Sequence, residues 1–335
     1  MYKVSIVIPI YNAERYLRQC LGSLAFQTLR DIEVICIDDC SEDGSREILE
    51  GYAAKESCVR ILRLPENLGQ GTARNRGLEI AQGEYVYFMD ADDELANQDV
   101  LFRLVQEIDR DNLDVLFFDA ETVIDDGVCN VVVRAEDYIR KNDYSVVSSG
   151  QELLSEFLKN REYTVSPCLA IYRRSFLEEN NIRFPSDHIF YEDNIFMTRV
   201  MLAAKRASHR PWHLYVRKVH AGSTVMSKPT IRHLRGHLAC YRDVCELLEH
   251  SDWDRLTRKV LNDRRVVYKL NVRRTVDSYP DLLDSTNDEL NKDELVLLHA
   301  IMKYPISEKI VNGLRCLRNH GIVYTLKRVL FGRQC

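Results

Sequence analysis

The sequence predicts an α/β fold in which a mixed, mainly parallel sheet carries helices on its faces and a helical extension follows. Three observations support this prediction. Short apolar runs of strand length alternate with segments of helical periodicity in the first part of the 335-residue chain. Polar side chains follow directly after several of these runs, and beyond residue 227 the pattern changes to charged, amphipathic helices. Apolar strands separated by helices are typical of a parallel sheet that helices cover.

The first part of the chain contains the clearest alternation. Strands are expected at residues 4–8, 33–37, 59–64 and 85–89. Helices are expected between them, at residues 13–26, 45–54 and 71–80. Pro9 and Pro65 follow the first and third runs and end them, because proline cannot donate a hydrogen bond to a neighbouring strand. In the first helix Leu17, Leu21 and Leu24 recur at the spacing of one buried helix face.

From about Asp114 the pattern becomes mixed. Further strands are expected at residues 115–118, 131–133, 168–172 and 212–219. Further helices are expected at residues 151–159, 174–180 and 194–204. We expect one domain over residues 1–227, with halves at 1–113 and 114–227, and a helical extension over residues 228–335.

Charge and cysteine content limit the function classes. The net charge of −5 argues against a protein that binds nucleic acid, because such proteins usually carry a basic surface. The chain has 10 cysteines but no Cys-x-x-Cys pair, which indicates reduced thiols rather than a disulfide framework or a zinc site. No apolar run approaches the roughly 20 residues that span a bilayer. A cytoplasmic protein is therefore expected.

Polar clusters follow the first, second and fourth predicted strands: Tyr11-Asn12, Asp38-Asp39, and Asp90-Ala91-Asp92. Open α/β sheets bind ligands in the crevice outside the carboxyl ends of their strands. Three clusters from three strands are therefore expected to converge on one ligand site.

Several motifs resemble, in their order and spacing, the family 2 glycosyltransferases of the GT-A fold. These motifs are residues 4–12, Ile37-Asp38-Asp39-Cys40-Ser41, Asn67-Leu68-Gly69, Ala73-Arg74-Asn75 and residues 89–93, and the similarity resumes at Glu192-Asp193 and residues 217–224. The resemblance implies that residues 1–227 form an inverting, metal-dependent catalytic domain. It would transfer a sugar from a nucleotide diphosphate sugar, expected to be a UDP-sugar, to a hydroxyl of a saccharide or lipid-linked saccharide. Such enzymes build bacterial capsule, exopolysaccharide or lipooligosaccharide.

The aspartates after the fourth strand are the expected metal site. Residues i and i+2 of a strand end lie on the same side, and Mg²⁺ or Mn²⁺ prefers oxygen ligands and substrate phosphates. By resemblance Asp92 ligates the cation and Asp90 lies against the ribose and the metal. His220 is a further candidate ligand, because a neutral imidazole can bind such a metal. The alternative is that the aspartates only end a strand and cap a helix, and that His220 is a surface residue.

The donor is expected to meet the other two clusters. A carboxylate can accept a hydrogen bond from the ring N–H of uracil, a role the family usually gives to the second aspartate, here Asp39. The resemblance places Pro9 and Tyr11 in the base pocket and Asn67 among the donor-binding residues. Arg74 lies one turn into a helix that starts at the crevice, so its charge and the helix dipole would both act on the donor. Cys40 stands where the family usually has glycine or asparagine.

Asp193 is the expected catalytic base. Inversion needs a carboxylate that takes the proton of the acceptor hydroxyl as its oxygen attacks the anomeric carbon. The family places this base in a Glu-Asp pair at the start of a helix, here Glu192-Asp193. The alternative is that both acids only complement the helix dipole.

Residues 314–335 carry five basic side chains, no acidic one, and apolar residues at helical spacing. Such a helix can lie peripherally on an anionic membrane or pack on the protein. Two rival functions also stay open: a polyprenyl-phosphate sugar synthase, against which the Glu192-Asp193 element speaks, and a catalytically silent nucleotide-binding scaffold at a membrane.

Overall fold

The computed structural model describes residues 2–125, 130–133, 138–186, 189–220, 230–249, 253–278 and 290–303. The chain divides into two compact units, which are described separately. The sheet unit comprises Met1–Leu153, Thr164–His188 and Asp193–Ser227. The helical unit comprises Leu154–Tyr163, Ile189–Glu192 and Lys228–Cys335. Two of its segments precede the boundary expected near residue 228, which stays a prediction.

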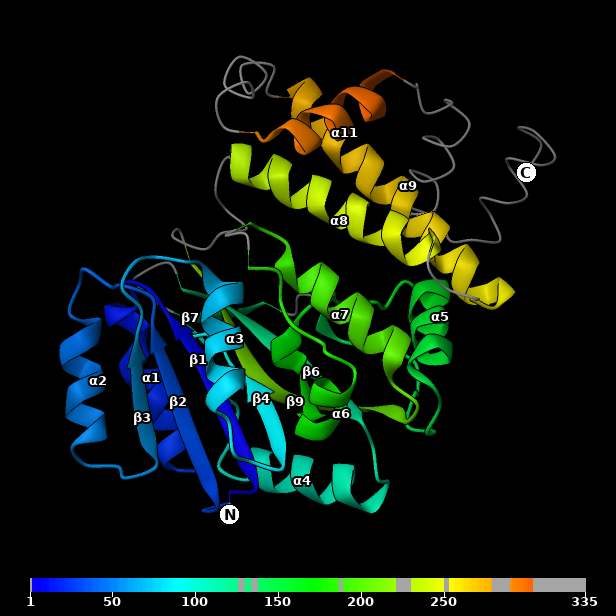
Figure 1. The fold of residues 1–335 in the computed structure, drawn as a ribbon. Helices are drawn as coiled ribbons and strands as arrows, with labels where there is room; N and C mark the ends of the chain where they lie inside the picture. Colours follow the sequence, from blue (N-terminus) through cyan, green and yellow to red (C-terminus); the bar gives the residue numbers. More distant parts are fainter. Residues whose placement is uncertain are drawn as a thin grey trace. The chain divides into compact units, whose positions relative to one another are not determined.

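The sheet unit is built on one mixed sheet of nine strands within the described residues (Figure 1). Its order is β3-β2-β1-β4-β8-β6-β9-β5, with β7 paired to β6. The first four strands along the chain are parallel neighbours, and β8 joins β4 and β6 in antiparallel pairing. The strands are β1 (Val4–Ile10), β2 (Ile32–Asp38), β3 (Val59–Arg63), β4 (Tyr85–Phe88), β5 (Glu94–Leu95), β6 (Val115–Asp125), β7 (Asn130–Val133), β8 (Ala170–Arg173) and β9 (Ala207–Val219).

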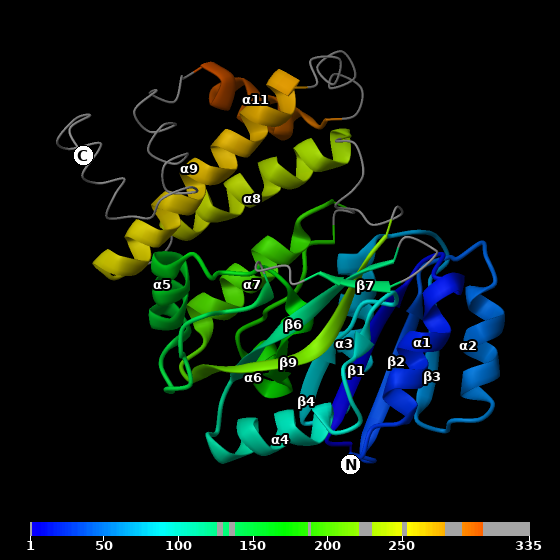
Figure 2. The ribbon, with the colours of Figure 1, turned by 180° about the vertical axis from the view of Figure 1, so that it is seen from behind.

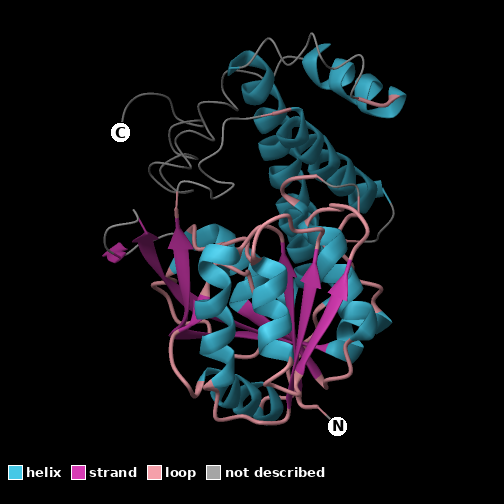
Figure 3. Cartoon of the chain, turned by 90° about the vertical axis from the view of Figure 1, so that its left-hand side faces the viewer, coloured by secondary structure: helices cyan, strands magenta, loops and turns pink. Residues whose placement is uncertain are grey.

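Helices cover both faces of this sheet (Figure 3). The helices of the sheet unit are α1 (Glu14–Ala25), α2 (Ser45–Ala53), α3 (Gln70–Ile80), α4 (Val100–Arg110), α6 (Arg174–Glu179) and α7 (Glu192–Ala203), and α5 (Gly150–Asn160) begins in the sheet unit and continues in the helical unit. Helix α3 lies on the face seen in Figure 1, and α1 lies on the opposite face, seen in Figure 2. Right-handed crossovers explain this division, because the chain steps from β1 to β3 on one side and then returns to β4. The predicted α/β fold with a mixed sheet is confirmed.

The core sits around β1 and β2, in which every residue is buried. Helix α3 packs closely on β1 at Gly77, where a Cβ atom would lie only 2.3 Å from Cγ1 of Val7. Glycine is needed at this contact because any side chain would push the helix away from the strand. The close contact brings the amino end of α3 to the carboxyl end of β1, where the polar clusters lie.

The structure corrects several element predictions. Helix α4 and the short strand β5 were not expected. The strand expected at 168–172 starts later, because Pro167–Leu169 form a 3₁₀ turn before β8. Strand β9 starts at Ala207, earlier than the expected 212, and β1 continues through Pro9 to Ile10, so Pro9 does not end it as expected.

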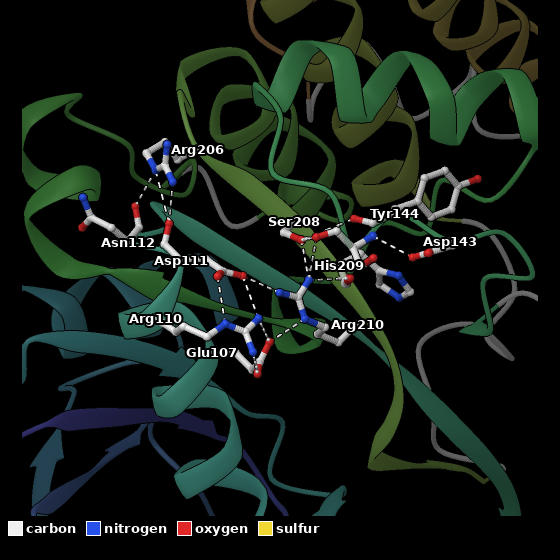
Figure 4. A network of polar contacts seen from close by, with 11 residues as sticks. Glu107, Arg110, Asp111, Asn112, Asp143, Tyr144, Arg206, Ser208, His209 and Arg210 are labelled. Carbon is white, nitrogen blue, oxygen red and sulfur yellow. Dashed lines mark hydrogen bonds and ion pairs between the residues drawn. The ribbon is translucent and has the colours of Figure 1, made fainter.

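The carboxyl end of α4 is tied to β9 by the polar network in Figure 4. Arg210 Nε donates to Oε2 of Glu107 at 2.6 Å, and Arg206 donates to the backbone carbonyls of Asp111 and Asn112. The Arg206 bonds satisfy backbone carbonyl groups at and just beyond the end of α4, which have no intrahelical donors, and the Arg210 bond pairs a side-chain carboxylate of the last turn with β9.

The helical unit contains α8 (Ile231–Glu249), α9 (Arg255–Ser278) and α11 (Lys292–Lys303). These helices share an apolar cluster composed of Leu234, Leu238, Val272, Val276, Leu290, Leu298 and Ile301. Among the helices of the described residues, none has the length and apolar character that a bilayer crossing requires. The basic helix expected at residues 314–335 lies outside the described residues and stays a prediction.

Candidate active site

The loops after β1 and β2 are bound to each other at the carboxyl edge of the sheet. The backbone amide of Asn12 donates to Oγ of Ser41 at 3.1 Å, and the backbone amide of Glu42 donates to Oδ1 of the Asn12 side chain at 2.8 Å. The Asp39 amide also donates to the carbonyl of Ile10 at 2.8 Å. The first two polar clusters of the sequence therefore form one connected surface.

Asp39 connects this surface to the loop that begins α3. Its Oδ1 accepts the amide of Leu68 and its Oδ2 accepts the amide of Gly69, each at 2.8 Å. The Asp39 side chain is buried, so these charge-assisted bonds are strong. Gly69 has φ of 86°, a left-handed conformation that glycine adopts without steric cost. Asp39 thus sets the conformation of the Asn67-Leu68-Gly69 loop, and its expected contact with uracil stays a prediction.

Cys40 has φ of 64°, in the left-handed region. Glycine and asparagine adopt this conformation more easily than other residues. The backbone therefore explains the departure noted in the sequence: the turn is kept, and Cys40 carries its conformational cost.

Arg74 is the centre of the site. Its side chain is only 1% exposed. Its Nη2 donates to Oδ1 of Asp90 at 2.7 Å and its Nη1 donates to Oδ1 of Asp193 at 2.8 Å. The guanidinium carbon lies 5.1 Å from the centre of the Phe184 ring. One buried cation therefore joins the end of β4 to the start of α7.

The neighbour of Arg74 holds the aromatic segment in place. Nδ2 of Asn75 donates to the carbonyl of Phe184 at 2.8 Å, and Oδ1 of Asn75 accepts the Phe184 amide at 2.9 Å. The Ala73-Arg74-Asn75 motif therefore supplies both the cation and the bond that positions the ring beside it. Arg76, by contrast, is exposed and pairs with Glu79 on its own helix.

The electrostatics of Asp193 follow from these neighbours. Burial raises the pKa of the Asp193 carboxyl, the charge of Arg74 lowers it, and the charge of Asp90 raises it again. The net direction of the pKa is upward. A carboxylate with a raised pKa accepts protons more readily, which suits a general base.

Asp92 and His220 form the second part of the site. Nε2 of His220 lies 3.0 Å from Oδ2 of Asp92, and the imidazole ring stacks on Tyr16 with ring centres 4.5 Å apart. Burial raises the pKa of Asp92, and the charge of Asp90 raises it further. Asp93 is buried and accepts the Lys218 amide at 2.7 Å, which binds the β4 loop to β9.

The residues around Asp92 fit a hard divalent cation. Asp92 offers carboxylate oxygens and His220 offers a ring nitrogen. Burial and the charge of Asp90 raise the pKa of Asp92, and a bound cation would offset this effect by stabilising the charged carboxylate. Within the described ranges, no group of three or more His, Cys, Asp or Glu side chains converges on one metal position. A magnesium site typically uses one or two protein carboxylates and completes its shell with substrate phosphates and water.

The remaining predicted donor-binding residues lie at the same edge. Pro9 is buried near the end of β1, Tyr11 follows β1 with its side chain 49% exposed, and Asn67 is half-buried in the loop that Asp39 holds. Their expected roles in the base pocket stay predictions.

Sequence reasoning missed four neighbours of the site. They are Tyr16, Gln70, Phe184 and Tyr215. Gln70 donates to Oδ1 of Asp90 at 3.2 Å, and its position four residues before Arg74 was a usable signal, because such residues share a helix face. Tyr215 accepts the Asp90 amide through its hydroxyl oxygen at 3.2 Å. The stacking of Tyr16 on His220 had no signal in the sequence.

The sequence matches the family model described as "Glycosyl transferase family 2" over residues 5–180, more than half of the chain. The chain belongs to this family. It is 34% identical over 220 residues to the glycosyltransferase YibD of Escherichia coli, which covers 65% of this chain and 62% of that protein. It is 32% identical over 209 residues to the poly(ribitol-phosphate) beta-glucosyltransferase of Bacillus spizizenii, which covers 62% of this chain and 30% of that protein.

The chain thus spans less than two thirds of the length of these family 2 relatives. A structural comparison supports the family assignment at the level of the fold. The crystal structure of S. aureus TarS 1–349 in complex with UDP-GlcNAc aligns with a TM-score of 0.65 and 23% identity, and covers 98% of this chain and 90% of that one. This likeness confirms the predicted GT-A fold.

Proposed function

We propose that the protein is an inverting glycosyltransferase that moves a sugar from a UDP-sugar to a hydroxyl of a saccharide or lipid-linked saccharide. The observation that carries this proposal is the fork of Arg74, which binds Asp90 and Asp193 at 2.7 and 2.8 Å. Asp90 belongs to the cluster expected to face the donor, and Asp193 is the expected base. A transferase needs its donor site and its catalytic base close together, so that the acceptor hydroxyl can reach the anomeric carbon of the donor.

The chemistry requires one proton transfer and one displacement. The oxygen of the acceptor hydroxyl forms a bond to the anomeric carbon, and the bond from that carbon to the diphosphate oxygen breaks. The hydroxyl proton passes to the Asp193 carboxylate, and the electron pair leaves with the nucleoside diphosphate. Arg74 binds Oδ1 of Asp193 and keeps the carboxylate oriented during this step.

Asp92 and His220 would hold Mg²⁺ or Mn²⁺, with Asp90 close to the ribose and the metal. When bound, the cation supplies positive charge that offsets the growing charge of the leaving diphosphate. Stacking on Tyr16 restricts the orientation of the His220 ring. This restriction would keep Nε2 directed toward Asp92.

Donor and acceptor classes are proposed from the site and from related proteins. Asp39, Pro9, Tyr11 and Asn67 would form the pocket for the base, with Asp39 selecting uracil. The complex of TarS with UDP-GlcNAc and the poly(ribitol-phosphate) acceptor in the name of a relative support a UDP-sugar and a bacterial surface glycan. We propose that residues 1–227 carry this activity and that the protein acts in the cytoplasm.

A panel of nucleotide sugars tests this proposal. Purified protein is mixed with UDP-, GDP- and CDP-sugars and a set of saccharide acceptors, and release of the nucleoside diphosphate is measured. UDP-sugars should be consumed, and UDP should bind more tightly than CDP in calorimetric titration. A clear preference for CDP would reject the uracil assignment. Transfer to polyprenyl phosphate alone would favour the rival synthase, and no release from any donor would favour the scaffold.

A further inference from the structure

The chain segment that leads into the expected base packs on helix α8, within the helical unit. This segment, Ile189–Glu192, directly precedes Asp193 and ends at the first residue of α7. At its closest point it meets Gly236. A Cβ atom on Gly236 would lie 2.0 Å from the carbonyl oxygen of Phe190 and 3.1 Å from Cδ2 of Tyr191. The main chain of Phe190 therefore occupies the space that any side chain at position 236 would need.

Two histidines of α8 hold the aromatic side chains of this segment. The ring of Tyr191 stacks on His237 with centres 4.3 Å apart and planes 12° apart. The ring of Phe190 lies 4.3 Å from His233. One turn further along α8, Sγ of Cys240 donates to the carbonyl of Tyr191 at 3.6 Å. Helix α8 therefore contacts both the rings and the backbone of the segment. We call Gly236 and His237, together with Tyr191, the α8 clamp.

The clamp holds a backbone conformation that is costly by itself. Tyr191 has φ of 67°, a left-handed conformation that is rare for a large aromatic residue. Such residues persist where surrounding contacts over-determine them, and they cluster at functional sites. The left-handed turn at Tyr191 sets the direction in which the chain enters α7, two residues before the carboxylate that Arg74 binds.

We propose that the α8 clamp positions Asp193 for catalysis, so that Gly236, His237 and Tyr191 are positioning residues for the transfer reaction. This inference rests on the proposed function, because it assumes that Asp193 is the base. A base that is misplaced by about 1 Å can lose on the order of a hundredfold in rate while the donor still binds. The helical unit thereby contributes to turnover through the chain segment that it holds.

The state of His237 suits a stacking role. Burial lowers the pKa of His237 to about 4, so the imidazole is neutral at physiological pH. Its Nδ1 atom is buried and has no hydrogen-bond partner within the described part of the chain. A phenyl ring can therefore replace the imidazole without breaking a bond at Nδ1.

The first test compares two helical glycines. Gly236→Ala places a methyl group against the carbonyl of Phe190, whereas Gly51→Ala in α2 meets no atom within 4 Å. Both changes replace a helical glycine with a better helix former, and only Gly236→Ala introduces the contact with Phe190. Gly236→Ala should lower kcat by about 10- to 100-fold and keep the Kd for UDP within about twofold, whereas Gly51→Ala should change neither. A Gly236→Ala protein with wild-type kcat would overturn the proposal.

The second test does not depend on how Gly236→Ala folds. His237→Ala removes the stacked ring, and His237→Phe restores one of similar shape. Turnover should fall about tenfold or more in His237→Ala and recover in His237→Phe, with UDP binding unchanged in both. Wild-type turnover in His237→Ala, or equal loss in both variants, would overturn the clamp. If the wild-type protein releases no nucleoside diphosphate from any donor, the proposed function fails, and if Asp193→Asn keeps full activity, the assignment of the base fails, so both failures are distinguishable from a failure of the clamp.

Discussion

Nη1 of Arg74 lies 2.8 Å from Oδ1 of Asp193, and the same guanidinium binds Asp90 through Nη2. Arg74 is buried, whereas the two carboxylates are partly exposed, with 29% and 28% of their side chains accessible. The carboxylates can therefore meet ligands from solvent while the cation that fixes them is shielded. This arrangement makes Arg74 the residue on which the geometry of the site depends.

Arg74→Met should disable the enzyme without abolishing the fold. Methionine keeps the apolar bulk against Phe184 but leaves Asp90 and Asp193 without the cation that joins them. We expect kcat/KM to fall by at least about a hundredfold, or roughly 2.7 kcal/mol of transition-state stabilisation. Arg76→Met is the matched control on the same helix, because its exposed pair with Glu79 contributes little. Equal losses in both variants would contradict the central role of Arg74.

The pH dependence of turnover should change in the same variant. Burial raises the pKa of Asp193 and Arg74 lowers it, so loss of Arg74 raises this pKa further. The base is active when deprotonated, and the acidic limb of kcat against pH should therefore move to higher pH in Arg74→Met. The pKa values of Asp92 and Asp93 are also raised, by burial and by neighbouring carboxylates, and that contribution is common to both proteins. A limb that stays in place or moves to lower pH would argue against Asp193 as the titrating base.

Asp39→Asn should weaken donor binding. The asparagine side chain has one oxygen and one NH₂ group, and the NH₂ group cannot accept a hydrogen bond. One of the two bonds from the backbone amides of Leu68 and Gly69 is therefore lost. Loss of one charge-assisted bond costs about 1.5–3 kcal/mol, so the Kd for UDP should rise by about tenfold or more. Glu42→Gln, an exposed neighbour, is the control. The loss should be larger for UDP than for CDP if Asp39 also contacts uracil, and equal losses would limit Asp39 to holding the loop.

Cys40→Gly should stabilise the protein. Cys40 adopts φ of 64°, and glycine removes the steric cost of this conformation. That cost is about 1–2 kcal/mol, partly offset by the entropy that glycine loses on folding. We expect the free energy of unfolding to rise by about 0.5–1 kcal/mol in urea denaturation. Cys58→Gly, at a residue with ordinary negative φ, should lower it, and a loss of stability in Cys40→Gly would refute the strain argument.

The sequence predicted the parallel part of the sheet and the convergence of its polar clusters. Both follow from local patterns, because carboxyl ends of adjacent parallel strands share one edge. The contact between Arg74 and Asp193 could not be derived in this way. It depends on the antiparallel placement of β8 beside β4, for which the chain carries no local signal. Helix α4 was missed although its signal was present, since Leu101, Leu104 and Ile108 recur at helical spacing.

The metal prediction concerns Asp92. Treatment with EDTA should stop transfer, and added Mg²⁺ or Mn²⁺ should restore it. Asp92→Ala should reduce transfer by several orders of magnitude at saturating metal, since Asp92 would be the carboxylate that holds the cation. Thermal denaturation should stay close to wild type, because the Asp92 side chain is 34% exposed and packs little. Transfer that survives both EDTA and Asp92→Ala would remove the metal-dependent mechanism.

The most direct test of the account is the rate of sugar transfer by Asp193→Asn. Asparagine keeps the size of the side chain and an oxygen for Arg74, but it cannot take the proton of the acceptor hydroxyl. We predict that UDP binds with unchanged affinity while kcat falls by about 10²–10⁴-fold, the usual contribution of general base catalysis. Glu192→Gln, the adjacent acid, should retain most of the activity. Transfer at the wild-type rate by Asp193→Asn, or its loss in Glu192→Gln alone, would contradict the assignment of the base.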